Sequence, residues 1–137
     1  MGSDLKEAET TNAVIGAFYD VYNALGYGFL EGLYLEALER ELVARGHRVG
    51  REVHVPVFYH GAELGRQRLD MVVDEKVVVE AKATEALHPI ATRQLFAYLR
   101  AIRLEVGLLL HFGPRPRFRR VVCLNRPDPD ANPGSGY

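Results

Sequence analysis

The segment 77–83, VVVEAKA, constrains the fold of this 137-residue chain most, because it is an apolar, strand-forming run that carries a carboxylate and an ammonium group. Side chains alternate across a strand, so Glu80 and Lys82 share one face while Val79 and Ala81 share the other. A run this apolar is typical of a central strand that is covered on both faces. Glu80 and Lys82 are therefore candidates for a functional site.

A second strand, from Arg68 to Val73, precedes this one and joins it through a short loop. If that loop has an odd number of residues centred on Glu75, Asp70 lies directly opposite Glu80, with Cβ atoms about 5 Å apart. A shift of one residue would place Asp70 on the other face. Two carboxylates this close repel each other, and a bound divalent cation resolves the conflict. Hard oxygen ligands of this kind suit Mg²⁺ or Mn²⁺.

Lys82 lies one pleat beyond Glu80, where it can orient or deprotonate an attacking water and offset the charge of a phosphate. The alternative is that Asp70, Glu80 and Lys82 lie in water on an exposed strand face. An isolated D…ExK spacing is a weak signal, because two acids and a lysine occur at such distances by chance. The apolar strand around Glu80 favours the functional interpretation.

Helical and strand-like periodicities alternate along the rest of the chain. The pattern predicts two helices, three antiparallel strands, a crossover helix and two more strands, and thus an α/β fold with a mixed central sheet flanked by helices. Thr10 or Thr11 is expected to cap the first helix. We expect a flexible N-terminus over residues 1–9, one domain over 10–125, and a disordered tail over 126–137. The expected later elements are helices at 30–45 and from Pro89 to Ile102, and strands at 53–59, 106–112 and 118–124.

Three further polar side chains on the predicted helices are candidates for the same site. Glu31 shares the core-facing stripe of the second helix, which suggests a cation or a buried partner for its carboxylate. The alternative is that Glu31 only complements the dipole of the helix, since it lies in the first turn. Gln94 and Tyr98 share a face of the third helix and could hold a water or contact a phosphate; a partly exposed polar face explains them equally well.

Composition excludes several classes of protein. The net charge of −1 and the pI of about 6.5 argue against a protein that coats nucleic acid through bulk positive charge. The single cysteine, Cys123, rules out an intrachain disulfide, and no apolar run approaches the roughly 18 residues of a membrane span. With no signal peptide at its start, the chain is expected in the cytoplasm. Four arginines near Gly113-Pro114 could contact nucleic acid, or could simply protect an edge strand: Arg115, Arg117, Arg119 and Arg120.

The residues Gly28-Phe29-Leu30-Glu31-Gly32-Leu33-Tyr34 match the G-x-x-E-x-x-Y signature of the small GxxExxY proteins. The similarity continues through REVHVPVFYHG, LGRQRLDMVV, KVVVEAKA and GLLLHFG, and so covers about residues 12 to 125. The chain thus resembles the GxxExxY family within the PD-(D/E)xK nuclease-like superfamily. The spacing of Gln94 and Tyr98 is similar to a helix motif of RecB-like exonucleases.

This resemblance implies a restriction-endonuclease-like core and a Mg²⁺- or Mn²⁺-dependent nuclease. It implies that Asp70, Glu80 and the carbonyl of Ala81 bind the metal, that Glu31 completes the site, and that Lys82 is the catalytic lysine. Gln94 and Tyr98 would act from the helix motif. The residue before Asp70 is leucine instead of proline, a position that touches no metal.

The expected function is hydrolysis of nucleic-acid phosphodiesters, DNA in particular, with a homodimer as a possible form. The alternatives are a non-catalytic nucleic-acid-binding or assembly module on the same fold, and a hydrolase of another phosphoester. The intact set of Asp70, Glu80 and Lys82 argues against the binding module, because a decayed site usually loses one member.

Overall fold

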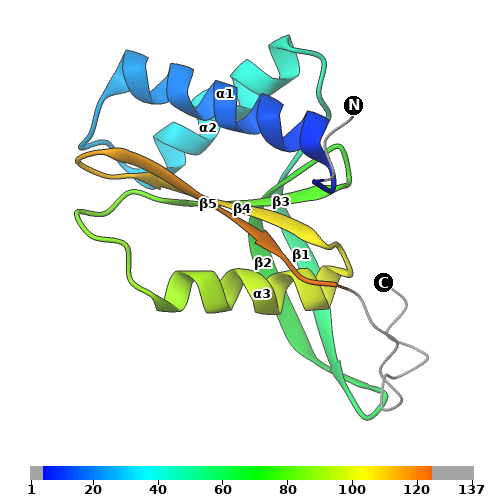
Figure 1. The fold of residues 1–137 in the computed structure, drawn as a ribbon. Helices are drawn as coiled ribbons and strands as arrows, with labels where there is room; N and C mark the ends of the chain where they lie inside the picture. The colour runs from blue at the N-terminus through cyan, green and yellow to red at the C-terminus, as the bar shows by residue number, and fades with distance from the viewer. Residues whose placement is uncertain (1–4, 125–137) are drawn as a thin grey trace.

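Five strands form one mixed sheet with helices on both faces (Figure 1) in a computed structural model that describes residues 5–124. The strands lie side by side in chain order, and only β3 and β4 are parallel, because the crossover helix α3 joins them. The predicted α/β fold with a mixed sheet is confirmed. The elements are α1 (Ala8–Leu25), α2 (Glu31–Ala44), β1 (Val49–Tyr59), β2 (Ala62–Val73), β3 (Val77–Lys82), α3 (Ile90–Ile102), β4 (Val106–Phe112) and β5 (Pro116–Val122).

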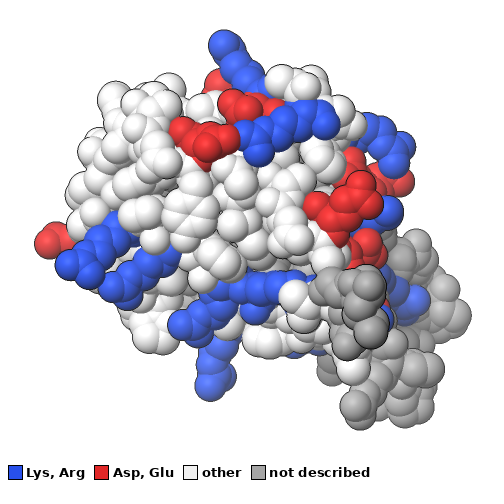
Figure 2. All heavy atoms as spheres, turned by 45° about the horizontal axis from the view of Figure 1, so that its top comes forward, with Lys and Arg blue, Asp and Glu red and all other residues white. Residues whose placement is uncertain are grey.

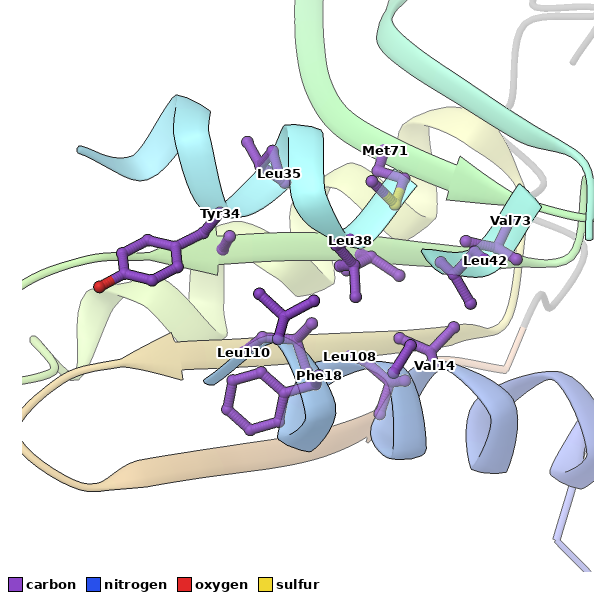
Figure 3. Packing of buried hydrophobic residues seen from close by; sticks show 14 of the residues in the cluster. Val14, Phe18, Tyr34, Leu35, Leu38, Leu42, Met71, Val73, Leu108 and Leu110 are labelled. Carbon is purple, nitrogen blue, oxygen red and sulfur yellow. The ribbon is translucent and has the colours of Figure 1, made fainter. Parts of the chain in front are cut away.

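The sheet separates two hydrophobic clusters. On one face, α1 and α2 pack their apolar stripes on the strands, with Phe18, Tyr34 and Leu38 fully buried (Figure 3). On the other face, α3 packs Leu95 and Leu99 against a smaller cluster that includes Val72 and Val78. Strand β3 is thus covered on both sides, as its apolar sequence predicts. Glu80 and Lys82 lie on the face that α3 covers.

The first helix begins at Ala8, so the cap predicted at Thr10 or Thr11 is wrong. Both threonines are buried inside the first turns of α1. The hydroxyl of Thr10 donates to Asp74 Oδ2 at 3.3 Å, which ties α1 to the turn between β2 and β3. The hydrogen bond to Asp74 thus gives Thr10 a partner inside the helix, although threonine otherwise favours helix ends.

The β1–β2 hairpin is longer than predicted. Strand β2 begins at Ala62 instead of Arg68, and β1 begins at Val49 instead of Val53. The hairpin extends past the helices in Figure 1, and Tyr59 at its tip is 62% exposed. Of the valines in β1, Val55 alone is fully buried, because the core does not reach the far end of the hairpin.

The other limits shift by a few residues. Strand β5 begins at Pro116 and ends at Val122, two residues earlier than predicted at each end. Pro89 caps α3 instead of lying in its first turn. Helix α2 runs from Glu31 to Ala44, within one residue of expectation. The predicted tail over 126–137 lies outside the described residues, as do residues 1–4. Among the described helices, none is both long and apolar enough to cross a membrane.

Candidate active site

Asp70 and Glu80 lie side by side where β2 and β3 separate. The antiparallel ladder pairs Val73 with Val77, and it ends at the pair of Met71 and Val79. The connecting turn has three residues, and two of them adopt left-handed backbone with φ of 54° and 57°, which closes the hairpin tightly. The same register carries one step further to Asp70 and Glu80, so the predicted placement opposite each other is confirmed.

Side-chain hydrogen bonds replace the backbone ladder at this pair. The amide of Asp70 donates to Glu80 Oε2 at 3.1 Å, and the amide of Ala81 donates to Asp70 Oδ2 at 3.0 Å. Both carboxyl groups are nearly buried, with 9% and 6% of Asp70 and Glu80 exposed. Each carboxyl is thus held by the other strand's backbone, which fixes its orientation before any ligand arrives.

Burial raises the pKa of Glu80 to about 9, and the hydrogen bond and negative charge of the neighbouring Asp70 add to the effect. The ammonium group of Lys82 opposes this shift, so it lies close to the same carboxyl. Two carboxyl groups in this position cannot easily both be ionised. A bound cation would allow both to be charged.

Glu31 approaches the pair from the N-terminus of α2. Burial raises the pKa of Glu31, and the charge of Asp70 raises it further, while Lys82 and Arg68 oppose the shift. The backbone of Ala83, just after β3, also acts to lower the pKa of this carboxyl. Glu31 is thus near enough to Asp70 and Lys82 for their charges to act on its carboxyl, and its role at the site stays a prediction.

The hydroxyl of Tyr34 fixes the loop that precedes Glu31. Tyr34 is fully buried, donates to the carbonyl of Gly26 at 2.5 Å, and accepts from the amide of Phe29 at 3.2 Å. Gly26 and Gly28 adopt φ of 72° and 119°, which residues with a Cβ rarely do. The Tyr34 ring stacks on Phe112 of β4, with centroids 4.2 Å apart. These contacts set the start of α2, and with it Glu31, against the sheet.

We expect Tyr34→Phe to lower the free energy of unfolding by about 1–3 kcal/mol, because two loop hydrogen bonds lose their partner inside the protein. Urea denaturation followed by circular dichroism measures the change. Tyr59→Phe is the matched control, because this substitution also removes a tyrosine hydroxyl, but from the exposed tip of the hairpin. Equal stability of the two variants would show that the Tyr34 hydroxyl does not hold the loop.

Tyr98 of α3 also faces the pair. Burial raises the pKa of Tyr98, and the charges of Glu80 and Asp70 add to the shift. Gln94 lies one turn earlier on the same helix and is exposed. The charges of the pair thus act on the Tyr98 hydroxyl, and the roles of Tyr98 and Gln94 stay predictions.

Arg68 is a neighbour of the site that sequence reasoning missed. Its guanidinium lies 3.9 Å from Asp70 Oδ1 and 3.1 Å from Glu52 Oε1 on β1. Arg68 precedes Asp70 by two residues on the same strand, and this spacing alone predicts a shared face. A cation here limits the repulsion among the acids.

The donors at the site fit a hard divalent cation. Asp70, Glu80 and Glu31 supply carboxylate oxygens, which are the ligands that Mg²⁺ and Mn²⁺ prefer. Within residues 5–124, no three His, Cys, Asp or Glu side chains are already gathered closely enough to hold a metal ion. The proteins of the superfamily that the chain resembles typically use divalent metals, and which ion suits this site stays a prediction.

Comparison with known proteins agrees with this geometry. A family model described as the PD-(D/E)XK nuclease superfamily matches residues 8–121. The crystal structure of SSO0001 superposes with a TM-score of 0.54 at 21% sequence identity, and the match covers 85% of this chain and 58% of that one. At this identity the likeness shows the fold alone, and the chain spans less than two thirds of that protein. No curated protein matches the sequence.

The family match extends from the first residues of α1 almost to the end of β5 and includes Asp70, Glu80 and Lys82. The restriction-endonuclease-like core implied by the resemblance is confirmed, while the narrower likeness to GxxExxY proteins stays a prediction. By this match, the chain belongs to the PD-(D/E)XK nuclease superfamily.

Proposed function

We propose that this protein is a metal-dependent nuclease that hydrolyses phosphodiester bonds of nucleic acid, with DNA as its substrate. The observation that carries the proposal is the buried pair of Asp70 and Glu80, held by each other's strand, with Lys82 on the same face. Membership of the nuclease superfamily supports the same chemistry.

In this proposal, Asp70, Glu80 and the carbonyl of Ala81 hold Mg²⁺ or Mn²⁺, and Glu31 completes the site from α2. The bound ion supplies a Lewis acid for the phosphate and lowers the pKa of the attacking water. Lys82 orients that water or takes its proton, and offsets negative charge on the phosphate. Tyr98 and Gln94 act from α3, and the effect of the Glu80 and Asp70 charges on the pKa of Tyr98 supports a place for the tyrosine near the carboxylates.

The cytoplasm is the proposed location. A domain of this size has little surface with which to surround a duplex, so we propose that it acts on DNA as a homodimer. Sedimentation velocity with and without a DNA duplex measures the stoichiometry. A single protomer on the duplex at saturation would contradict the dimer and leave the chemistry of the site unaffected.

The proposed function is tested by incubating the protein with labelled linear, circular and single-stranded DNA, and with RNA, in Mg²⁺, Mn²⁺ or EDTA. We expect cleavage of DNA in either metal and none in EDTA. The same assay is repeated with phosphodiesters that are not nucleic acids. Cleavage of these substrates alone would identify a hydrolase of another phosphoester. Binding of DNA without cleavage in any metal would contradict the nuclease and support a binding module on this fold.

A further inference from the structure

Side chains on the Glu80 and Lys82 face of the sheet continue in rows across the neighbouring strands. Lys82 pairs with His111 of β4, and His111 pairs with Arg117 of β5. One step earlier, Glu80 lies beside Leu109, which pairs with Arg119. Neighbouring strands lie about 4.8 Å apart, so the two arginines lie roughly 10 Å from the candidate active site, on its own face of the sheet.

A pocket of about 520 Å³ opens at this edge, between the β4–β5 turn and the connection from β3 to α3. Its wall includes Glu85, Leu87, His111, Arg115, Arg117 and Arg119. The three arginines are exposed. The ion pairs found within residues 5–124 involve other basic side chains, so the charge of these arginines is available to an external anion.

His111 forms a fixed part of the pocket wall. Its Nε2 lies 2.8 Å from the carbonyl oxygen of Thr84, and its ring packs on Gly113, where a Cβ would come within 2.5 Å of the ring. The side chain is 4% exposed, and in the described part of the chain its Nδ1 has no hydrogen-bond partner.

We propose that this arginine-lined pocket binds a phosphate group of the nucleic-acid strand whose scissile bond lies at Asp70 and Glu80. The inference rests on the proposed function and extends it to a second contact with the same strand. The planar guanidinium groups of Arg117 and Arg119 match phosphate oxygens in pairs. Lys and Arg side chains gather at the left edge of Figure 2, the edge at which the β4–β5 turn lies in Figure 1.

The test compares wild type with the double variant Arg117→Ala/Arg119→Ala. A fluorescein-labelled single-stranded 20-mer is titrated in EDTA, so that cleavage does not start, and anisotropy is recorded at several salt concentrations. We expect the double variant to bind about tenfold more weakly at 0.1 M salt. The slope of log K against log salt should fall in magnitude by about 0.7, because the pocket contacts one phosphate and each phosphate contact on a single strand contributes about 0.7.

The matched control is Arg40→Ala/Arg48→Ala, which removes the same charge from two exposed, salt-bridged arginines away from the pocket. We expect this variant to bind like wild type, and thermal melts should show that all three proteins are folded. An unchanged affinity and slope in the Arg117/Arg119 variant would overturn the proposal. The absence of DNA binding by wild type would also overturn the proposal. Either result would favour the alternative that the arginines protect the edge strand β5.

Strands with 5′-phosphate, 3′-phosphate or hydroxyl ends identify the source of the phosphate. A loss of affinity confined to one phosphorylated end indicates a site for a terminal phosphate, whereas an equal loss with all three strands indicates the backbone. Failure of this inference is distinguishable from failure of the nuclease. Metal-dependent cleavage that is independent of Arg117 and Arg119 would refute only the pocket, and arginine-dependent binding without cleavage would refute only the enzyme.

Discussion

Lys82→Ala should lower the rate of metal-dependent DNA cleavage on the order of 10²-fold or more, because it removes a group that acts on the water and the phosphate. Lys82 is not a metal ligand, so the fold and most of the metal affinity should be retained. Single-turnover cleavage of a labelled oligonucleotide measures the rate, and isothermal titration with Mn²⁺ measures the affinity. Lys82→Arg should not restore the rate, because a guanidinium is wider and does not release a proton.

Lys76→Ala is the control for this variant. Lys76 lies in the turn before β3, at the opposite end of the strand, and is exposed. We expect Lys76→Ala to cleave DNA at the wild-type rate, although it has lost the same positive charge as Lys82→Ala. If Lys82→Ala also cleaved like wild type, the activity would come from another site or a contaminant.

Glu80→Gln should stabilise the metal-free protein at pH 8 by at least about 1 kcal/mol and abolish the stabilisation that Mg²⁺ gives to wild type. In the folded, metal-free state, burial and the adjacent Asp70 raise the pKa of Glu80 to about 9, whereas the carboxyl of the unfolded chain has the model value of 4.5. Ionising Glu80 in the folded state is therefore costly, and glutamine removes that cost while keeping an oxygen that can accept from the Asp70 amide.

The sign of the pH dependence follows from proton binding. Between pH 4.5 and about 9, the folded protein holds a proton on Glu80 that the unfolded chain has released. The contribution of this group to stability is therefore complete below pH 4.5 and is lost as the pH rises toward 9. Urea denaturation at pH 5 and pH 8 should show this decline in wild type and a smaller one in Glu80→Gln. The control Glu75→Gln, in the exposed β2–β3 turn, should lose as much stability as wild type between pH 5 and pH 8. A loss in Glu80→Gln as large as that of wild type would refute the prediction.

The register of the candidate site was predictable from sequence because it depends on two local features. Alternation on the β3 strand assigns Glu80 and Lys82 to one face, and the odd loop around Glu75 places Asp70 opposite. The core-facing stripe of α2 likewise predicted that Glu31 points inward. The roles of these residues in metal binding and catalysis remain predictions.

Other features depend on contacts that the local sequence does not encode. The residues 62–67, AELGRQ, have no strand-like alternation, and they form β2 only because β1 pairs with them. In the first turn of α1, the hydroxyl of Thr10 donates to Asp74, 64 residues away, and the local sequence does not show this contact. The row that links Lys82 to His111 and Arg117 needs the order of β3, β4 and β5, which periodicity alone does not give.

The most direct test of the account is a crystal of the wild-type protein grown with Mn²⁺, in which the anomalous scattering of the ion locates it. The account predicts an anomalous peak between the carboxylates of Asp70 and Glu80, and no peak there in Glu80→Gln crystals grown in the same way. A wild-type crystal at saturating Mn²⁺ with no peak at this pair, and with the two carboxyl groups still accepting from the amides of Ala81 and Asp70, would contradict the account.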